Sequence, residues 1–134
     1  MKLSASDAFD LAKRLVDTSK QISDVLFNKG LPLNDNWEKL KSTNMLLLAA
    51  AGNLTTHGVG VILEDGKADL NQLKDVIQKA KDALQVVTNI KKAMAIAGAL
   101  LDIATAIPTG NIASIATSAA GLFKTLGLQV PFEI

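Results

Sequence analysis

The chain has 134 residues, of which 49% are hydrophobic and 20% are charged, and its formal net charge is +1. This length fits a single domain, residues 1–134, and the apolar content is too high for a disordered chain. The near-neutral charge and the aromatic content of 4% argue against nucleic-acid binding, and the absence of cysteine excludes disulfides and thiolate metal sites.

The first predicted helix spans residues 5–28. Its apolar side chains, such as Ala8, Leu11 and Leu15, recur at three- and four-residue spacing, which is typical of an amphipathic helix. Ser4 or Ser6 is expected to cap its start, and Pro32 prevents the helix from continuing.

A second helix is expected over about residues 36–52, capped by Asn34 or Asn36. The side predicted to be buried comprises Trp37, Leu40, Leu47, Leu48 and Ala51.

Residues 54–66 show the weakest helical pattern. Gly58 and Gly60 adjoin a β-branched cluster, and Glu64-Asp65-Gly66 is a turn signal. Three alternatives stay open: a short β-like insertion, an irregular connection, or a continuation of the second helix through its glycines.

The third predicted helix is long, over about residues 70–107, because no proline interrupts a heptad-like apolar seam. A straight helix of this length would span roughly 57 Å, so we expect either a kink near Gly98 or an elongated molecule. A turn at 107–111 precedes a fourth helix over 112–126, and the apolar tail 128–134 is expected to dock in extended form. The predicted fold is therefore an all-α four-helix bundle with one long helix and a short irregular or β-like insertion near 54–66.

One segment differs sharply in composition from the rest. Residues 93–123 contain a single charged side chain, Asp102, and the turn at 107–111 divides them into two similar arms. Small residues repeat four positions apart, which allows two helix backbones to approach closely. Each arm offers about 14–16 residues, or roughly 21–24 Å, whereas a bilayer's apolar layer is about 30 Å thick.

This alanine- and glycine-rich hairpin resembles the hydrophobic hairpins of α-helical pore-forming toxins, including colicin-type pore domains and multi-component helical haemolysins. The resemblance covers about 31 of the 134 residues and rests on composition, symmetry and the central turn. It implies a membrane-active protein that inserts residues 93–123 into a bilayer.

The simpler interpretation is that the hairpin forms the core of the bundle. In that case the protein is a non-enzymatic helical interaction protein, and the hairpin also supplies an interface for a protein partner or a second copy. The candidate residues for an interface or for membrane insertion are the same in both interpretations: Ile96, Leu100, Leu101, Asp102, Ile103, Ile107, Pro108, Ile112, Ile115, Leu122 and Phe123.

Catalytic machinery is not apparent in the sequence. His57 is the one histidine, so no Ser-His-Asp triad is possible without it, and it lies in a Thr-Thr-His-Gly stretch. We therefore expect no catalytic residue, no metal, no cofactor and no small-molecule substrate. Asp102 is expected at an exposed edge or paired with Lys13 or Lys124, or, in a membrane role, as a protonatable gate. No secretory signal is evident, so we expect a cytoplasmic protein, with signal-independent export left open.

Overall fold

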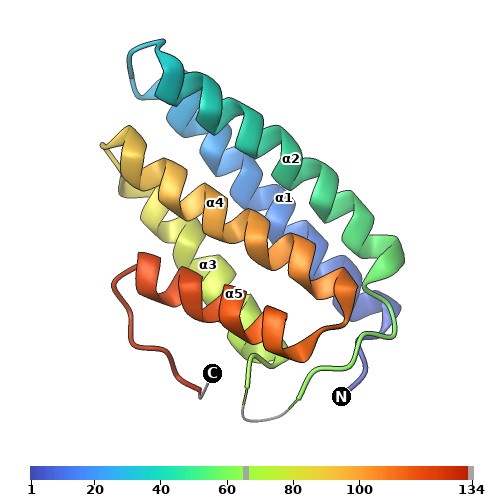
Figure 1. Cartoon of the computed structure of the whole chain (residues 1–134). Helices are drawn as coiled ribbons and strands as arrows, with labels where there is room; N and C mark the ends of the chain where they lie inside the picture. The colour runs from blue at the N-terminus through green and yellow to red at the C-terminus, as the bar shows by residue number, and fades with distance from the viewer. Residues whose placement is uncertain (65–66, 133–134) are drawn as a thin grey trace.

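The computed structural model describes residues 1–64 and 67–132, and these residues form five α-helices. Figure 1 shows how the helices are arranged. These residues contain no strand, so the predicted all-α class is confirmed. The number of helices is five instead of the expected four. The helices are α1 (Ala5–Asn28), α2 (Asp35–His57), α3 (Leu70–Val86), α4 (Ile90–Ala106) and α5 (Ile112–Thr125), with a 3-10 turn at Ile107–Thr109.

Helix α4 lies between α2 and α5, and α1 packs against both α2 and α3 (Figure 1). Helices α1 and α3 run in the same direction, whereas α2 and α4 run the opposite way. The connection between α3 and α4 is therefore a sharp reversal that brings α4 across the centre of the molecule.

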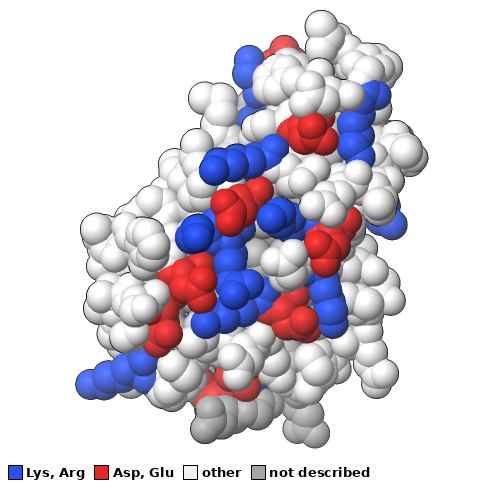
Figure 2. All heavy atoms as spheres, turned by 180° about the vertical axis from the view of Figure 1, so that it is seen from behind, with Lys and Arg blue, Asp and Glu red and all other residues white. Residues whose placement is uncertain are grey.

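Charged side chains gather on the face that α1 and α3 form, which Figure 2 shows from behind. On this face the Asp10 carboxylate of α1 forms two ion pairs. Lys74 Nζ lies 2.8 Å from one carboxylate oxygen, and Arg14 Nε lies 3.3 Å from the other. On α3 itself, Lys79 pairs with Asp75 at 3.0 Å. This face is the polar side of two amphipathic helices, whose opposite sides are buried.

The first two helices begin where side chains can bond their free N–H groups. Ser4 Oγ accepts from the Asp7 N–H at 3.0 Å, and Asn34 Oδ1 accepts from the Trp37 N–H at 3.2 Å. The predicted range 5–28 is confirmed. Helix α2 runs past Gly52 and ends at His57, with Gly58 as its C-cap. It therefore covers residues 54–57 of the expected insertion but does not continue through Gly58 and Gly60.

The remainder of the predicted insertion forms no strand in its described part. Residues 61 and 63 pair in antiparallel fashion with the start of the chain: the Leu3 N–H donates to Val61 O, and the Leu63 N–H to Met1 O, both at 2.8 Å. One isolated bridge, between Lys2 and Ile62, results. Residues 65 and 66 of the expected insertion lie outside the described residues.

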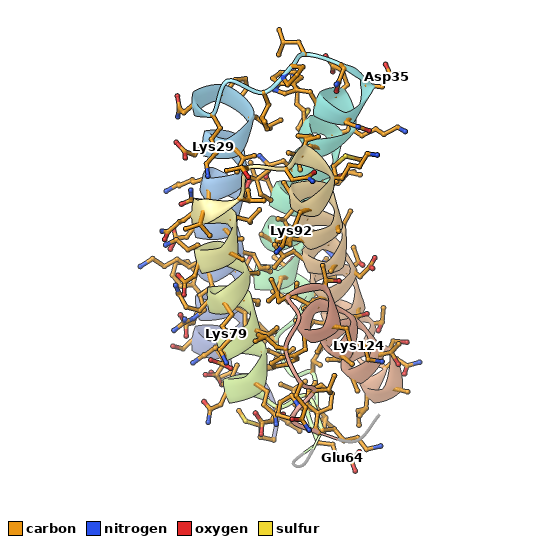
Figure 3. All side chains as sticks on the ribbon, turned by 90° about the vertical axis from the view of Figure 1, so that its left-hand side faces the viewer. Lys29, Asp35, Glu64, Lys79, Lys92 and Lys124 are labelled. Carbon is orange, nitrogen blue, oxygen red and sulfur yellow. The ribbon has the colours of Figure 1, made fainter. Side chains whose placement is uncertain are left out.

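The prediction of one long helix over 70–107 is wrong. The helix ends at Val86, and the next one starts at Ile90, after Val87 has turned to an extended conformation (φ −68°, ψ 137°). Two features explain the break: Val86-Val87-Thr88 is a β-branched run, and Asn89 Oδ1 accepts from the Lys91 N–H at 2.9 Å as a new N-cap. Lys29, at the end of α1, lies beside this break (Figure 3). Gly98, the expected weak point, lies inside α4.

The last helix and the described part of the tail follow the prediction. Gly110 (φ 70°) makes the turn before α5, and Gly127 (φ 73°) follows its end, both in the left-handed region that glycine tolerates. The tail returns to the bundle, where the Phe132 and Phe123 rings meet edge to face with centroids 6.0 Å apart. Residues 133 and 134 lie outside the described residues.

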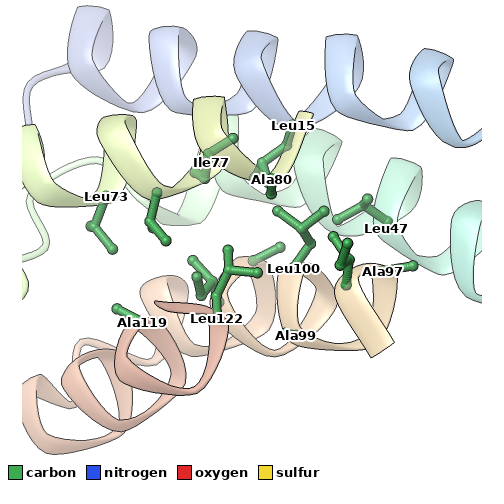
Figure 4. Close-up of a cluster of buried hydrophobic side chains, with 14 of the residues drawn as sticks. Leu15, Leu47, Leu73, Ile77, Ala80, Ala97, Ala99, Leu100, Ala119 and Leu122 are labelled. Atoms are coloured by element: carbon green, nitrogen blue, oxygen red, sulfur yellow. The ribbon is translucent and has the colours of Figure 1, made fainter. Parts of the chain in front are cut away.

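All five helices contribute to one aliphatic core, part of which is shown in Figure 4. Leu15, Leu47, Leu73, Leu100 and Leu122, one from each helix, have no exposed surface. Since aromatic residues are scarce, this core depends on close packing of leucine, isoleucine and alanine.

Candidate interaction surface

The large side chains of the hairpin formed by α4 and α5 point mainly into the protein. Of the eleven candidate residues, three are half-buried (Leu101, Pro108 and Ile112) and Asp102 is exposed. The other seven are buried: Ile96, Leu100, Ile103, Ile107, Ile115, Leu122 and Phe123.

The outer face of the hairpin carries small or polar side chains. Ala95, Asp102 and Thr105 are exposed on α4, and Ala113 and Thr117 are exposed on α5. Asp102 is exposed, as one of the alternatives predicted. Within the described residues no cation lies in salt-bridge range of it, so another alternative, a pairing with Lys13 or Lys124, does not form. Several large hydrophobic side chains are exposed among the described residues, but none of them belongs to residues 93–123.

Exposed apolar side chains are concentrated instead on α2. Met45, Leu46 and Leu48 are 65%, 58% and 49% exposed, which corrects the prediction that Leu48 is buried. The buried positions of α2 are Trp37, Leu40, Asn44, Leu47, Ala51 and Leu54, whose three- and four-residue spacing leaves Leu48 to one side. The outward residues Met45, Leu48, Ala49 and Gly52 also follow this spacing, and we call them the α2 stripe.

A shallow apolar groove lies beside this stripe, between α1 and α2. Its volume is about 290 Å³, and Phe9, which forms part of its wall, is 63% exposed. A Cβ placed on Gly52 would meet no atom within 4 Å, so the groove is open at this position. The lining residues are Phe9, Ala12, Lys13, Val16, Asp17 and Lys20 of α1 and Ala51, Gly52 and Thr55 of α2.

Buried polar contacts fix α1 and α2 against each other beneath this surface. Ser19 Oγ donates to Asn44 Oδ1 at 2.7 Å, and Asn44 Nδ2 donates to Ser23 Oγ at 3.1 Å. Near the other end of the pair, Trp37 Nε1 donates to the Leu26 carbonyl oxygen at 2.8 Å. Because a sliding helix would leave these buried groups unpaired, the groove has a defined shape.

The composition of α2 indicates this exposed surface, although the periodicity of its apolar residues does not. Residues 42–63 carry no formal charge, and Leu46-Leu47-Leu48 and Ala49-Ala50-Ala51 place apolar side chains on every side of the helix. A helix that is apolar on every side is expected to be surrounded by packing neighbours. Among the residues that the structure describes, α2 has neighbours on its inner side only, so its outer side is left exposed.

The titratable groups do not converge on a reactive centre in the part of the chain that the structure describes. His57 is exposed at the end of α2, where its Nδ1 lies 2.9 Å from Thr56 Oγ1. Among the same residues, no group of three potential metal ligands occurs. A hydrogen bond from Lys74 of α3 and the charge of Arg14 lower the pKa of Asp10.

Comparison of the chain with protein-family models, with curated proteins and with solved structures gave no match. In the described residues, no helix combines the length and the apolar character that crossing a bilayer would require.

Proposed function

We propose that this chain is a non-enzymatic helical interaction protein in which the hairpin of residues 93–123 forms the core and the α1–α2 surface binds a protein. The observation that carries this proposal is the exposure of Met45 and Leu48, which share one side of α2 with Gly52, and of Phe9, which lines the open groove. Contiguous exposed apolar side chains of this kind are typical of protein-binding surfaces. In this proposal the interface lies on α2, where Met45, Leu46 and Leu48 are exposed, and not on the hairpin.

The composition of the surface supports a protein partner. Met45 and Leu48 of α2 and Phe9 of α1 supply exposed apolar area, while Lys13, Asp17 and Lys20 line the α1 side of the groove. Protein interfaces commonly combine an apolar centre with a charged rim. The proposal of no catalytic role rests on the sequence, which contains one histidine and three glutamates.

A site-specific photo-cross-link tests this proposal. A benzophenone amino acid is placed at Leu48 and, as a matched control, at Thr105, which is exposed on α4. We expect a discrete protein adduct from position 48 in the native cells and none from position 105. Equal labelling at both positions, or no adduct at position 48, would contradict a protein-binding surface on α2.

A second candidate function is the insertion of the hairpin into a membrane, which its resemblance to the hairpins of pore-forming toxins suggests. Its support is the single charge, Asp102, in residues 93–123. Insertion would first require Leu100, Ile103 and Leu122 to leave the core. Dye release from anionic vesicles at pH 5 and pH 7 tests this role, and intact vesicles at both values would rule it out.

A further inference from the structure

We propose that a second copy of this chain occupies the α2 stripe, with the two α2 helices antiparallel about a two-fold axis between Leu48 and Ala49. This inference rests on the proposed function, because it names the partner of the same surface. In such a contact each residue meets its counterpart across the axis, so the stripe must be complementary to itself.

The order of large and small residues along the stripe meets this requirement. In the antiparallel register Met45 faces the partner's Gly52, and Leu48 faces the partner's Ala49. The symmetry repeats both contacts, so every large side chain lies opposite a small one. A parallel pairing in register would instead place Met45 against Met45 and Gly52 against Gly52. Large side chains would then meet large ones, and gaps would remain between the small ones.

The groove beside Gly52 supplies the space for the incoming methionine. It is bordered by Phe9, Gly52 and Thr55, and nothing lies within 4 Å of a Cβ built at Gly52. Methionine is flexible enough to fill such an irregular space, and its sulfur makes favourable contacts with aromatic rings. Phe9, which is 63% exposed in one copy, would then be covered by Met45 of the partner.

The centre of the α2 stripe carries no charge that would oppose self-association. A two-fold contact brings any charge near the axis close to its own copy, which is repulsive for like charges. Residues 42–63 carry no formal charge, so the centre of the proposed contact has no such repulsion. Lys41, the nearest charged residue of α2, would face the uncharged Thr56 of the partner.

Sedimentation velocity of the purified full chain, from about 10 µM to about 500 µM, tests the pairing. We expect a concentration-dependent monomer–dimer equilibrium. Gly52→Leu should weaken the dimer by about tenfold or more, because the new side chain blocks the partner's Met45. The same substitution should not destabilise the monomer, since position 52 is open and leucine favours a helix more than glycine does.

Two further variants make the test specific. Met45→Ala combined with Gly52→Leu should restore dimerisation, because the leucine then faces the partner's alanine in the antiparallel register. Gly98→Leu on α4 is the matched control: its site also has no atom within 4 Å of an added Cβ, and the dimer should be unaffected. Thermal unfolding of each variant checks that the fold is retained.

A wild-type chain that remains monomeric throughout, or a dimer insensitive to Gly52→Leu, would overturn this inference. The cross-link from position 48 separates that result from failure of the proposed function. An adduct of twice the chain's mass supports self-pairing, whereas an adduct with a different protein refutes self-pairing and leaves the proposed function standing. The absence of any adduct would contradict both the self-pairing and the proposed protein-binding surface.

Discussion

Lys29 Nζ donates a hydrogen bond of 2.8 Å to the carbonyl oxygen of Val87, joining the end of α1 to the break between α3 and α4. A second bond of 2.7 Å reaches Gln85 O. Helices α1 and α3 run in the same direction, so their C-terminal ends, both partially negative, lie close together. One cation therefore satisfies free carbonyl groups of α3 and offsets the negative ends of two helices.

The first prediction concerns this contact. Lys29→Met should lower the free energy of unfolding by about 1–2 kcal/mol, because the carbonyl groups lose a charged donor while the aliphatic part of the side chain is retained. Urea denaturation measures the change. Lys20→Met serves as the control, since Lys20 is exposed and lies 4.0 Å from its only ion-pair partner among the described residues, Asp17. An equal loss in both variants would show that the contact with α3 is not stabilising.

A second prediction addresses the buried polar contacts between α1 and α2. Asn44→Ala should lower the free energy of unfolding by about 1–3 kcal/mol, because the Ser19 and Ser23 hydroxyls lose their partner inside the protein. Asn53→Ala, the same change at an exposed position of α2, should have little effect. Thermal unfolding of both variants provides the comparison. If Asn53→Ala proved as harmful as Asn44→Ala, the loss at Asn44 could not be assigned to the buried contact.

A third prediction follows from the lowered pKa of Asp10. The hydrogen bond from Lys74 stabilises the ionised carboxylate in the folded protein, so the folded pKa lies below the ordinary value of 3.8. The resulting stability is present above that value and is lost as the pH falls through the folded pKa. Because the Asp10 side chain is 37% exposed, solvent screening limits the contribution to less than about 1 kcal/mol.

Asp10→Asn should therefore be less stable than the wild type at pH 7, and the difference should disappear in acid, below the folded pKa. Chemical denaturation across this pH range measures it. Asp102→Asn is the control, since Asp102 is exposed and has no ion pair in the described part of the protein. A difference that persisted unchanged in acid would mean that charge at Asp10 is not its source.

A fourth prediction tests the hairpin as the core. Leu100→Ala should lower the free energy of unfolding by about 2–5 kcal/mol, because Leu100 is fully buried in α4 and its truncation leaves a cavity. Leu48→Ala removes the same atoms from a side chain that is 49% exposed and should cost less than about 1 kcal/mol in the monomer. The two variants are compared by denaturation at low protein concentration. Similar losses would indicate that α4 is not a central element.

Local chemistry explains which expectations succeeded. The ranges 5–28 and 112–126 are bounded by residues that act within a few positions of themselves, such as Ser4, Gly110 and Gly127. The break at 87–89 also had local signals, the β-branched run and Asn89, but the unbroken apolar seam outweighed them in the prediction. The carbonyl group of Val87 is bonded by Lys29, which lies 58 positions away in the sequence. No sequence pattern predicts that contact.

The sequence by itself determined the all-α class, the aliphatic core and the ends of α1 and α5, because helix propensity and capping act over a few residues. Only the tertiary structure decided which apolar side chains remain in contact with water. Segment 42–63 has no formal charge and segment 93–123 has a single one, Asp102, so the two are similar as sequence. Among the described residues, however, α4 has helices on both sides, while α2 has one side without a neighbour. Burial depends on what packs against a helix, and distant parts of the chain supply those neighbours.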